Sequence, residues 1–194
     1  MHYRDRVHRP RGFDDPGHAH EFTFSCYHRF PFLAKNRTCI WLAESLHAAR
    51  IECDFQLWAY VFMPDHVHLI VCPRTPKYDG SRFLRRVKEP VARKAIAYLK
   101  QYAPHWLPRI RAQRGARIEH HFWQPGRGYD RNVIQSQTLL AMIDYLHLNP
   151  VRKRLVDAAK DWPWSSAGWF AGEPRNDLQP DSIPHEWLGM DSDQ

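Results

Sequence analysis

The sequence has no long apolar run, no paired-cysteine motif and no apolar stretch at its start, and each absence excludes a class of protein. A membrane-spanning helix needs about 18 consecutive apolar residues, so we expect no membrane partner. The four cysteines are too widely spaced for a CxxC zinc or redox motif. Because residues 1–6 carry no signal-peptide pattern, we expect a cytoplasmic protein with reduced thiols.

Acidic residues are scarce in the middle of the chain. Residues 74–117 hold 13 Lys and Arg but only two acids, a local charge of +11, whereas residues 157–194 hold two basic and eight acidic residues. The net charge of +7 over 194 residues therefore combines a cationic middle with an anionic tail. A one-signed excess of this size indicates a polyanionic partner bound by the middle segment.

The domain organisation follows from composition. Residues 1–20 are rich in His, Arg, Pro and Gly and are expected to form a flexible lead-in, in which the histidines are solvated. Residues 21–156 are expected to form a single globular domain. Residues 157–194 would be an acidic, loop-rich extension packed on that domain, punctuated by prolines.

Hydrophobic periodicity predicts an α+β fold. The expected order is β-α-β-β-α-β-α, with strands at 21–28, 54–62, 66–72 and 117–123 and helices at 38–51, 81–102 and 135–148. Pro90 should kink or split the second helix. The first six elements match the ferredoxin-like pattern, an antiparallel sheet with helices on one face. The other face is then free to carry a site.

Two histidines form the sharpest local signal. His66 and His68 flank Val67 in a predicted strand, so their side chains share a face with their roots about 6–7 Å apart. Two imidazoles at that spacing can lean toward one metal ion, although a third ligand must come from elsewhere in the fold. A single strand histidine is usually a packing residue, but the pair favours a metal or phosphate role.

The segment 144–150 (DYLHLNP) is the second signal. Tyr145 and Asn149 lie one helical turn apart at the edge of an apolar stripe. A tyrosine hydroxyl is a weak nucleophile, with a reference pKa of about 10, but it can attack a phosphodiester that a metal polarises. A site of two histidines and an amide would suit Mg²⁺ or Mn²⁺.

These residues resemble the HUH motif (U, hydrophobic) of single-tyrosine transposases of the IS200-like superfamily. The similarity is greatest to the REP-associated tyrosine transposases, and it spans roughly residues 20 to 170. The matching positions, in the same order along the chain, are Thr23, Arg29, the segment 62–68 (FMPDHVH), 123–125 (WQP), 145–151 (YLHLNPV) and 161–166 (DWPWSS).

The resemblance implies a role for each matched residue. His66, His68 and Asn149 would be the metal ligands and Tyr145 the nucleophile. The substrate would be single-stranded DNA, often beside a hairpin, cut to leave a 5′-phosphotyrosine and a free 3′-hydroxyl. Relatives act as monomers or as dimers, so a homodimer is compatible with the resemblance. The implied fold is ferredoxin-like with a C-terminal catalytic helix and a loop-rich tail, and the implied location is cytoplasmic, on the nucleoid when bound to DNA.

DNA binding would explain the basic middle of the chain. The basic residues expected to contact DNA are Arg82, Arg85, Arg86, Lys88, Arg93, Lys94, Arg127 and Arg131. The aromatic residues that could stack on unpaired bases are Trp106, Phe122, Trp123 and Tyr129.

Several alternatives stay open. Tyr98, Tyr102 or Tyr129 could be the nucleophile instead of Tyr145. A histidine-triad nucleotide hydrolase would need a third histidine at position 70, where Ile70 stands. A replication initiator or relaxase shares the HUH chemistry. A ferredoxin-like nucleic-acid-binding protein without catalysis is the non-enzyme alternative.

Overall fold

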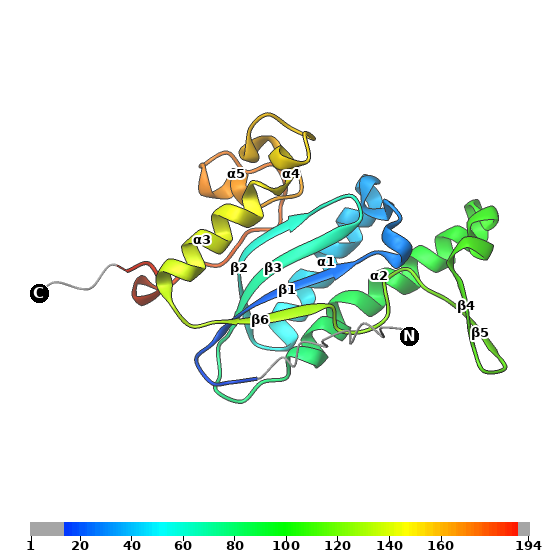
Figure 1. Cartoon of the computed structure of the whole chain (residues 1–194), viewed down its shortest axis with the longest axis horizontal. Coiled ribbons are helices and arrows are strands. Elements are labelled where there is room, and N and C mark those ends of the chain that lie inside the picture. The colour runs from blue at the N-terminus through cyan, green and yellow to red at the C-terminus, as the bar shows by residue number, and fades with distance from the viewer. Residues whose placement is uncertain (1–13, 190–194) are drawn as a thin grey trace, which may run out of the picture.

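The computed structural model describes residues 14–189, and its centre is a four-stranded antiparallel sheet in the order β2-β3-β1-β6 (Figure 1). The strands are β1 (Ala19–Ser25), β2 (Phe55–Phe62), β3 (His66–Pro73) and β6 (Tyr129–Val133). The main helices are α1 (Asn36–Glu52), α2 (Gly80–Tyr102) and α3 (Ser136–His147). This arrangement is the ferredoxin-like strand order, so the predicted fold is confirmed.

One face of the sheet packs against α1 and α2. Phe22 and Phe24 of β1 and Val67 and Leu69 of β3 point to this side, where they meet the buried apolar residues of both helices. The strict alternation of β1 sends its intervening residues to the opposite face. The main core therefore lies between the sheet and the helix pair.

The opposite face is covered over only part of its length, by α3. Ala19, Ile70 and Val133 pack against apolar residues of α3 at one end of the sheet. At the other end, Thr23 and the two histidines of β3 lie on the same face but are partly accessible. The helix thus leaves a polar area of sheet open beside it.

The expected split of α2 at Pro90 does not occur. A proline cannot donate the backbone hydrogen bond that the carbonyl four residues earlier would accept. Here the Ser45 hydroxyl, from α1, donates to that carbonyl, on Arg86, at 3.0 Å. The packed neighbouring helix therefore satisfies the group that the proline leaves open, and α2 runs as one helix of 23 residues.

The predicted fourth strand was placed wrongly. Residues 117–120 form β5 (Arg117–His120), which pairs only with β4 (Arg111–Arg114) in a separate hairpin at one end of the molecule (Figure 1). The true fourth strand, β6, reads YDRNV, which is short and contains Asp and Asn, two residue types depleted in strands. Pairing with β1 over five residues, rather than local preference, determines that it is a strand.

The expected boundary at residue 20 falls inside β1, and the expectation for His20 was wrong. His20 is fully buried. Its Nδ1 lies 3.0 Å from Oδ1 of Asp130 and its Nε2 lies 2.7 Å from the Tyr78 hydroxyl. His18 is partly exposed, whereas His2 and His8 lie outside the described residues.

The described part of the acidic extension, residues 157–189, runs along the outer edge of β2. Trp164 accepts a backbone hydrogen bond from Phe62 at 2.8 Å, and the Asp181 carboxylate accepts one from the Leu57 amide at 2.8 Å. The same carboxylate pairs with Arg50. The extension therefore covers a sheet edge that would otherwise expose unpaired backbone groups. The short helix α5 (Ala167–Phe170) lies within this extension, and the short helix α4 (Asn149–Arg152) directly precedes it.

Among the described residues, no helix is both long and apolar enough to cross a membrane.

Candidate functional site

His66 and His68 are brought together as the strand spacing predicts. Their ring centroids are 5.0 Å apart, and each side chain is 12% exposed. Burial lowers the pKa of His66 below its ordinary value, and the neighbouring His68 adds to this effect. A neutral imidazole is the form that binds a metal ion. The pair is therefore a candidate for two ligands of one cation.

Each imidazole is oriented through its Nδ1 atom. Nδ1 of His66 lies 2.6 Å from the Asp65 carboxylate, and Nδ1 of His68 lies 2.8 Å from the Thr23 hydroxyl. The Asp65 carboxylate can only accept, so it favours a proton on Nδ1 of His66, whereas the Thr23 hydroxyl can accept from or donate to Nδ1 of His68. In both rings the partner engages Nδ1 rather than Nε2. Both Nε2 atoms thus remain as the potential ligating atoms.

The surrounding loops hold the histidine that begins β3. The Asp65 carboxylate also accepts from the Arg29 guanidinium at 3.3 Å, and the Asp65 carbonyl accepts from the Cys26 amide at 2.8 Å. Arg29 and its neighbour His28 have positive φ angles of 56° and 50°. Such angles are uncommon outside glycine, so this segment is held in an unfavourable conformation next to the pair.

Tyr145 lies near the C-terminal end of α3 and is 52% exposed. The Arg152 guanidinium stacks on its ring, 4.3 Å from the centroid. Tyr145 lines a cavity of about 500 Å³ together with Glu21, Arg131 and four other residues of α3. The histidine pair is not among the residues lining this cavity.

Glu21 lies near both the histidine pair and the cavity of Tyr145, and the sequence patterns did not identify it. Its carboxylate lies 3.7 Å from Nδ1 of His68, and its side chain also lines the cavity beside Tyr145. Glu21 lies two residues before Thr23 in β1, so both point to the face that carries the histidines. The alternation of the first strand was the available signal, because it places 21, 23 and 25 on one face.

Asn149 is buried, and its amide nitrogen donates to the Tyr145 and Leu146 carbonyls at 3.2 and 3.3 Å. These bonds leave the amide oxygen as the group that could ligate a cation. Within residues 14–189, no cluster of three His, Cys, Asp or Glu side chains could hold a metal ion. A metal ion at the pair of imidazoles would therefore need a further donor, such as an amide oxygen or an atom of the substrate.

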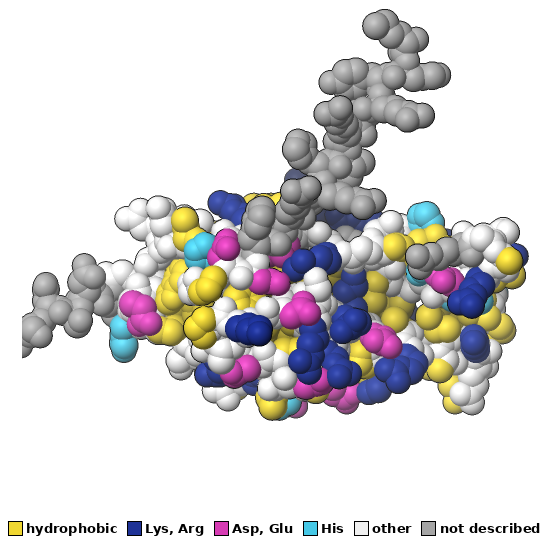
Figure 2. All heavy atoms as spheres, turned by 90° about the horizontal axis from the view of Figure 1, so that it is seen from below, with side chains coloured by type: hydrophobic (Ala, Val, Ile, Leu, Met, Phe, Trp, Pro, Cys, Tyr) yellow, Lys and Arg dark blue, Asp and Glu magenta, His cyan; other side chains and the backbone are white. Residues whose placement is uncertain are grey.

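Some basic residues of α2 form ion pairs with α1, and others line a cavity. Arg82 and Arg86 both pair with Glu52 of α1, at 3.2 and 2.7 Å, and Lys94 pairs with Glu44 at 2.7 Å. Figure 2 shows basic and acidic side chains intermingled on one face of the molecule. Because α1 and α2 pack on the sheet face opposite the histidines, this set does not surround the site. Arg93 is exposed on the same helix.

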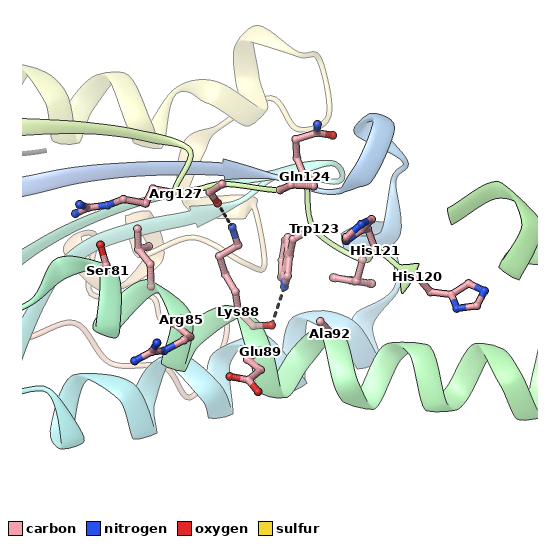
Figure 3. A pocket seen from close by; sticks show the side chains of 14 residues that line it. Ser81, Arg85, Lys88, Glu89, Ala92, His120, His121, Trp123, Gln124 and Arg127 are labelled. Carbon is pink, nitrogen blue, oxygen red and sulfur yellow. Dashed lines mark hydrogen bonds between the residues drawn. The ribbon is translucent and has the colours of Figure 1, made fainter. Parts of the chain in front are cut away.

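Lys88 and Arg85 line a second cavity, of about 460 Å³, between α2 and residues 120–127 (Figure 3). The Lys88 ammonium donates to the Gly126 carbonyl at 2.8 Å, and burial lowers its pKa to about 8. Lys88 therefore anchors the loop before β6. Arg127 pairs with Asp130 at 3.1 Å.

Two of the four aromatic residues expected to stack on bases are in the core. Phe122 is 2% exposed, and Trp123 is 6% exposed with its indole N–H donating to the Lys88 carbonyl. Trp106 packs with Phe30 and Phe32 away from the histidines. Tyr129, at 44% exposure, is the one whose ring lies on the histidine face.

The comparisons with known proteins agree with these observations. The chain is 26% identical over 180 residues to a REP-associated tyrosine transposase of Haemophilus influenzae, covering 87% of this chain and 91% of the relative. It superposes on a solved structure of a REP-associated tyrosine transposase bound to a REP hairpin with a TM-score of 0.66 and 18% identity, covering 92% of this chain and 99% of the other. No family model matches the chain. The resemblance expected from the motifs is thus confirmed in sequence and in fold.

Proposed function

We propose that this chain, which is similar to REP-associated tyrosine transposases, is a metal-dependent transposase and endonuclease of single-stranded DNA. It would cleave and rejoin DNA through a covalent 5′-phosphotyrosine on Tyr145, beside a hairpin of the REP kind. The observation that carries the proposal is the His66 and His68 pair, whose Nδ1 atoms are both engaged while Nε2 remains free.

The cation would be Mg²⁺ or Mn²⁺, held by His66 and His68 with the Asn149 amide oxygen as a third ligand. When bound, it would polarise the scissile phosphate and stabilise the charge that develops there. Asp65, and Thr23 when it accepts from Nδ1 of His68, would keep the imidazoles in the tautomer that ligates through Nε2. The low pKa of His66 keeps that ring neutral at neutral pH.

The protein groups around Tyr145 suit attack on phosphate. The Tyr145 oxygen would form a bond to phosphorus while the bond to the 3′ oxygen breaks, which leaves the 3′-hydroxyl free. The Arg152 guanidinium stacks on the Tyr145 ring, and the Arg131 side chain lines the cavity that Tyr145 also lines. Both positive charges would attract a phosphodiester that lies beside Tyr145. Because the phosphoester bond energy is retained, a second strand end can reverse the step and be joined without ATP.

The test uses a hairpin oligonucleotide of the REP kind, extended by single-stranded DNA. Incubation with the full chain and Mn²⁺ or Mg²⁺ should produce a protein–DNA adduct that survives a denaturing gel. Tyr145→Phe should abolish the adduct while retaining DNA binding. His66→Ala and His68→Ala should abolish it as well, because the cation loses a ligand.

Tyr129→Phe is the matched control for the alternative nucleophile, and this variant should still form the adduct. An adduct formed by Tyr145→Phe but lost in Tyr129→Phe would show that the nucleophile was assigned to the wrong residue. Binding of the hairpin with no cleavage under either metal would favour the non-catalytic binding protein.

A further inference from the structure

The ring of Tyr129 lies on the same sheet face as the histidine pair. Tyr129 in β6 pairs with Thr23 in β1, and Thr23 pairs in turn with His68 in β3. Directly paired residues of an antiparallel sheet project to the same side. Strands are spaced about 4.8 Å apart, so the Tyr129 and His68 backbones are about 10 Å apart across the open sheet.

The Gly128 backbone sets this position of Tyr129. Gly128 has a φ of +86°, and a Cβ atom built there would lie 2.2 Å from the Thr23 carbonyl oxygen. Only glycine permits so close an approach of β6 to β1 in this conformation. Any other residue would push the start of β6, and with it Tyr129, away from Thr23.

Polar contacts hold the segment on both sides of that glycine. Before it, the Lys88 ammonium donates to the Gly126 carbonyl (Figure 3). After it, Asp130 is buried against His20 at 3.0 Å and against Arg127 at 3.1 Å. The ring is nevertheless 44% exposed, so a firmly held backbone presents a large aromatic surface to solvent.

We propose that Tyr129 is the platform on which one unpaired base of the DNA stacks when the adjoining phosphate lies at the histidine pair. The inference rests on the proposed single-stranded DNA substrate. Base stacking on an aromatic ring tolerates any base, and the Tyr129 hydroxyl has no part in it. Tyr129 is therefore a positioning residue, which holds the strand in register with the site.

The experiment measures DNA affinity in the Tyr145→Phe background, where the substrate stays intact. Fluorescence anisotropy gives the Kd for the hairpin oligonucleotide and for versions with one abasic site moved through the single-stranded extension. Tyr129→Ala should weaken binding of the intact DNA about 5- to 150-fold, the range for loss of one stacked base, whereas Tyr129→Phe should restore it. Tyr102→Ala, which removes an exposed tyrosine at the end of α2, is the matched control and should leave the Kd unchanged.

The abasic series makes the assignment specific. One abasic position should weaken binding by the same factor in the chain with Tyr129 and in the Phe variant, but cause no further loss in the Ala variant. An equal Kd for Tyr129→Ala and its parent, or an abasic loss that persists in the Ala variant, would overturn the proposal. Thermal unfolding of each variant identifies any loss that comes from misfolding, and the Phe variant keeps the test decisive if the Ala variant fails to fold.

The two proposals fail in different ways. If the Kd values follow the expected abasic pattern but the unmodified chain forms no adduct, the proposed catalysis is refuted. The stacking role of Tyr129 is then still supported. If the unmodified chain forms the adduct but Tyr129→Ala has the same Kd as its parent, only the stacking proposal is refuted. Loss of the adduct in Tyr129→Phe would show that the hydroxyl takes part in the chemistry, which also overturns the platform.

Discussion

The Thr23 hydroxyl lies 2.8 Å from Nδ1 of His68, across the pairing of β1 with β3. Through this contact the neighbouring strand orients the His68 imidazole and leaves its Nε2 as the potential ligating atom. Glu21 reaches Nδ1 less closely, at 3.7 Å. The neighbouring strand β1 therefore supplies the outer contacts of His68, whereas His66 takes its own from Asp65, directly before β3.

Removing that hydroxyl should weaken metal binding. We expect Thr23→Val, which keeps the shape of the side chain, to reduce Mn²⁺ affinity about 10- to 100-fold, the usual cost of losing an outer contact to a metal-bound histidine. Isothermal titration calorimetry with Mn²⁺ measures the effect. Ser25→Ala removes a hydroxyl from the same strand face and is the control. Equal affinities for the Thr23 variant and its parent would show that His68 is oriented by other means.

Gly128→Ala should be strongly destabilising. The new methyl group would overlap the Thr23 carbonyl, and overpacking of this kind costs about 1–3 kcal/mol in addition to strain at positive φ. Gly126→Ala is the control, because Gly126 also has a positive φ but nothing lies within 4 Å of its Cβ position. Urea unfolding should show a clearly larger loss for Gly128→Ala. Equal losses would mean that the close approach of β6 to β1 is not needed.

The basic residues should differ in their contribution to DNA binding. Arg82 is paired with Glu52 on the α1 side, whereas Arg131 lines the cavity of Tyr145. Arg131→Ala should weaken binding and reduce the slope of log Kd against log salt by about 0.7, the value for one phosphate contact on a single strand. Arg82→Ala should leave the slope unchanged. The opposite pattern, measured by anisotropy over a salt series, would place the DNA along α2.

Stability should fall in acid through His147. Burial lowers the pKa of His147 to about 4, and its Nε2 lies 2.8 Å from the Ser166 hydroxyl. The unfolded chain binds a proton at this position near pH 6.5, whereas the native state does so only near pH 4. The free energy of unfolding should therefore decrease as pH falls between these values, by up to about 3 kcal/mol, with no effect above pH 7. His66, whose pKa is also lowered, adds to the same trend.

His147→Gln, which cannot take up the proton, should remove most of this dependence. Urea unfolding at pH 7, 5.5 and 4.5 measures it for both chains. A variant whose stability falls as steeply as that of the parent would show that His147 is not the group responsible.

Local pattern accounts for much of the fold and for the first half of the site. The alternation in β1 and at the start of β3, the apolar run of β2 and the periodicity of the three main helices are local properties. They predicted the element order and the shared face of His66 and His68. The fourth strand could not be predicted in this way, because its polar sequence becomes a strand only by pairing with β1. The same limit applied to His20, whose partners Tyr78 and Asp130 are 58 and 110 residues away in the chain.

The sequence by itself determined which side chains can do chemistry: two imidazoles at strand spacing, and a tyrosine and an asparagine one helical turn apart. Only the tertiary structure decided what surrounds them. It brought Thr23 and Asp65 to the imidazoles, placed Glu21 between His68 and the cavity of Tyr145, and turned Tyr129 toward the same face. It also engaged the side chains of Lys88 and Trp123 in hydrogen bonds within the protein, to the carbonyls of Gly126 and Lys88 respectively. The physical reason is that spacing within one element is set by backbone geometry, whereas burial, pairing and charge neutralisation depend on residues distant in the chain.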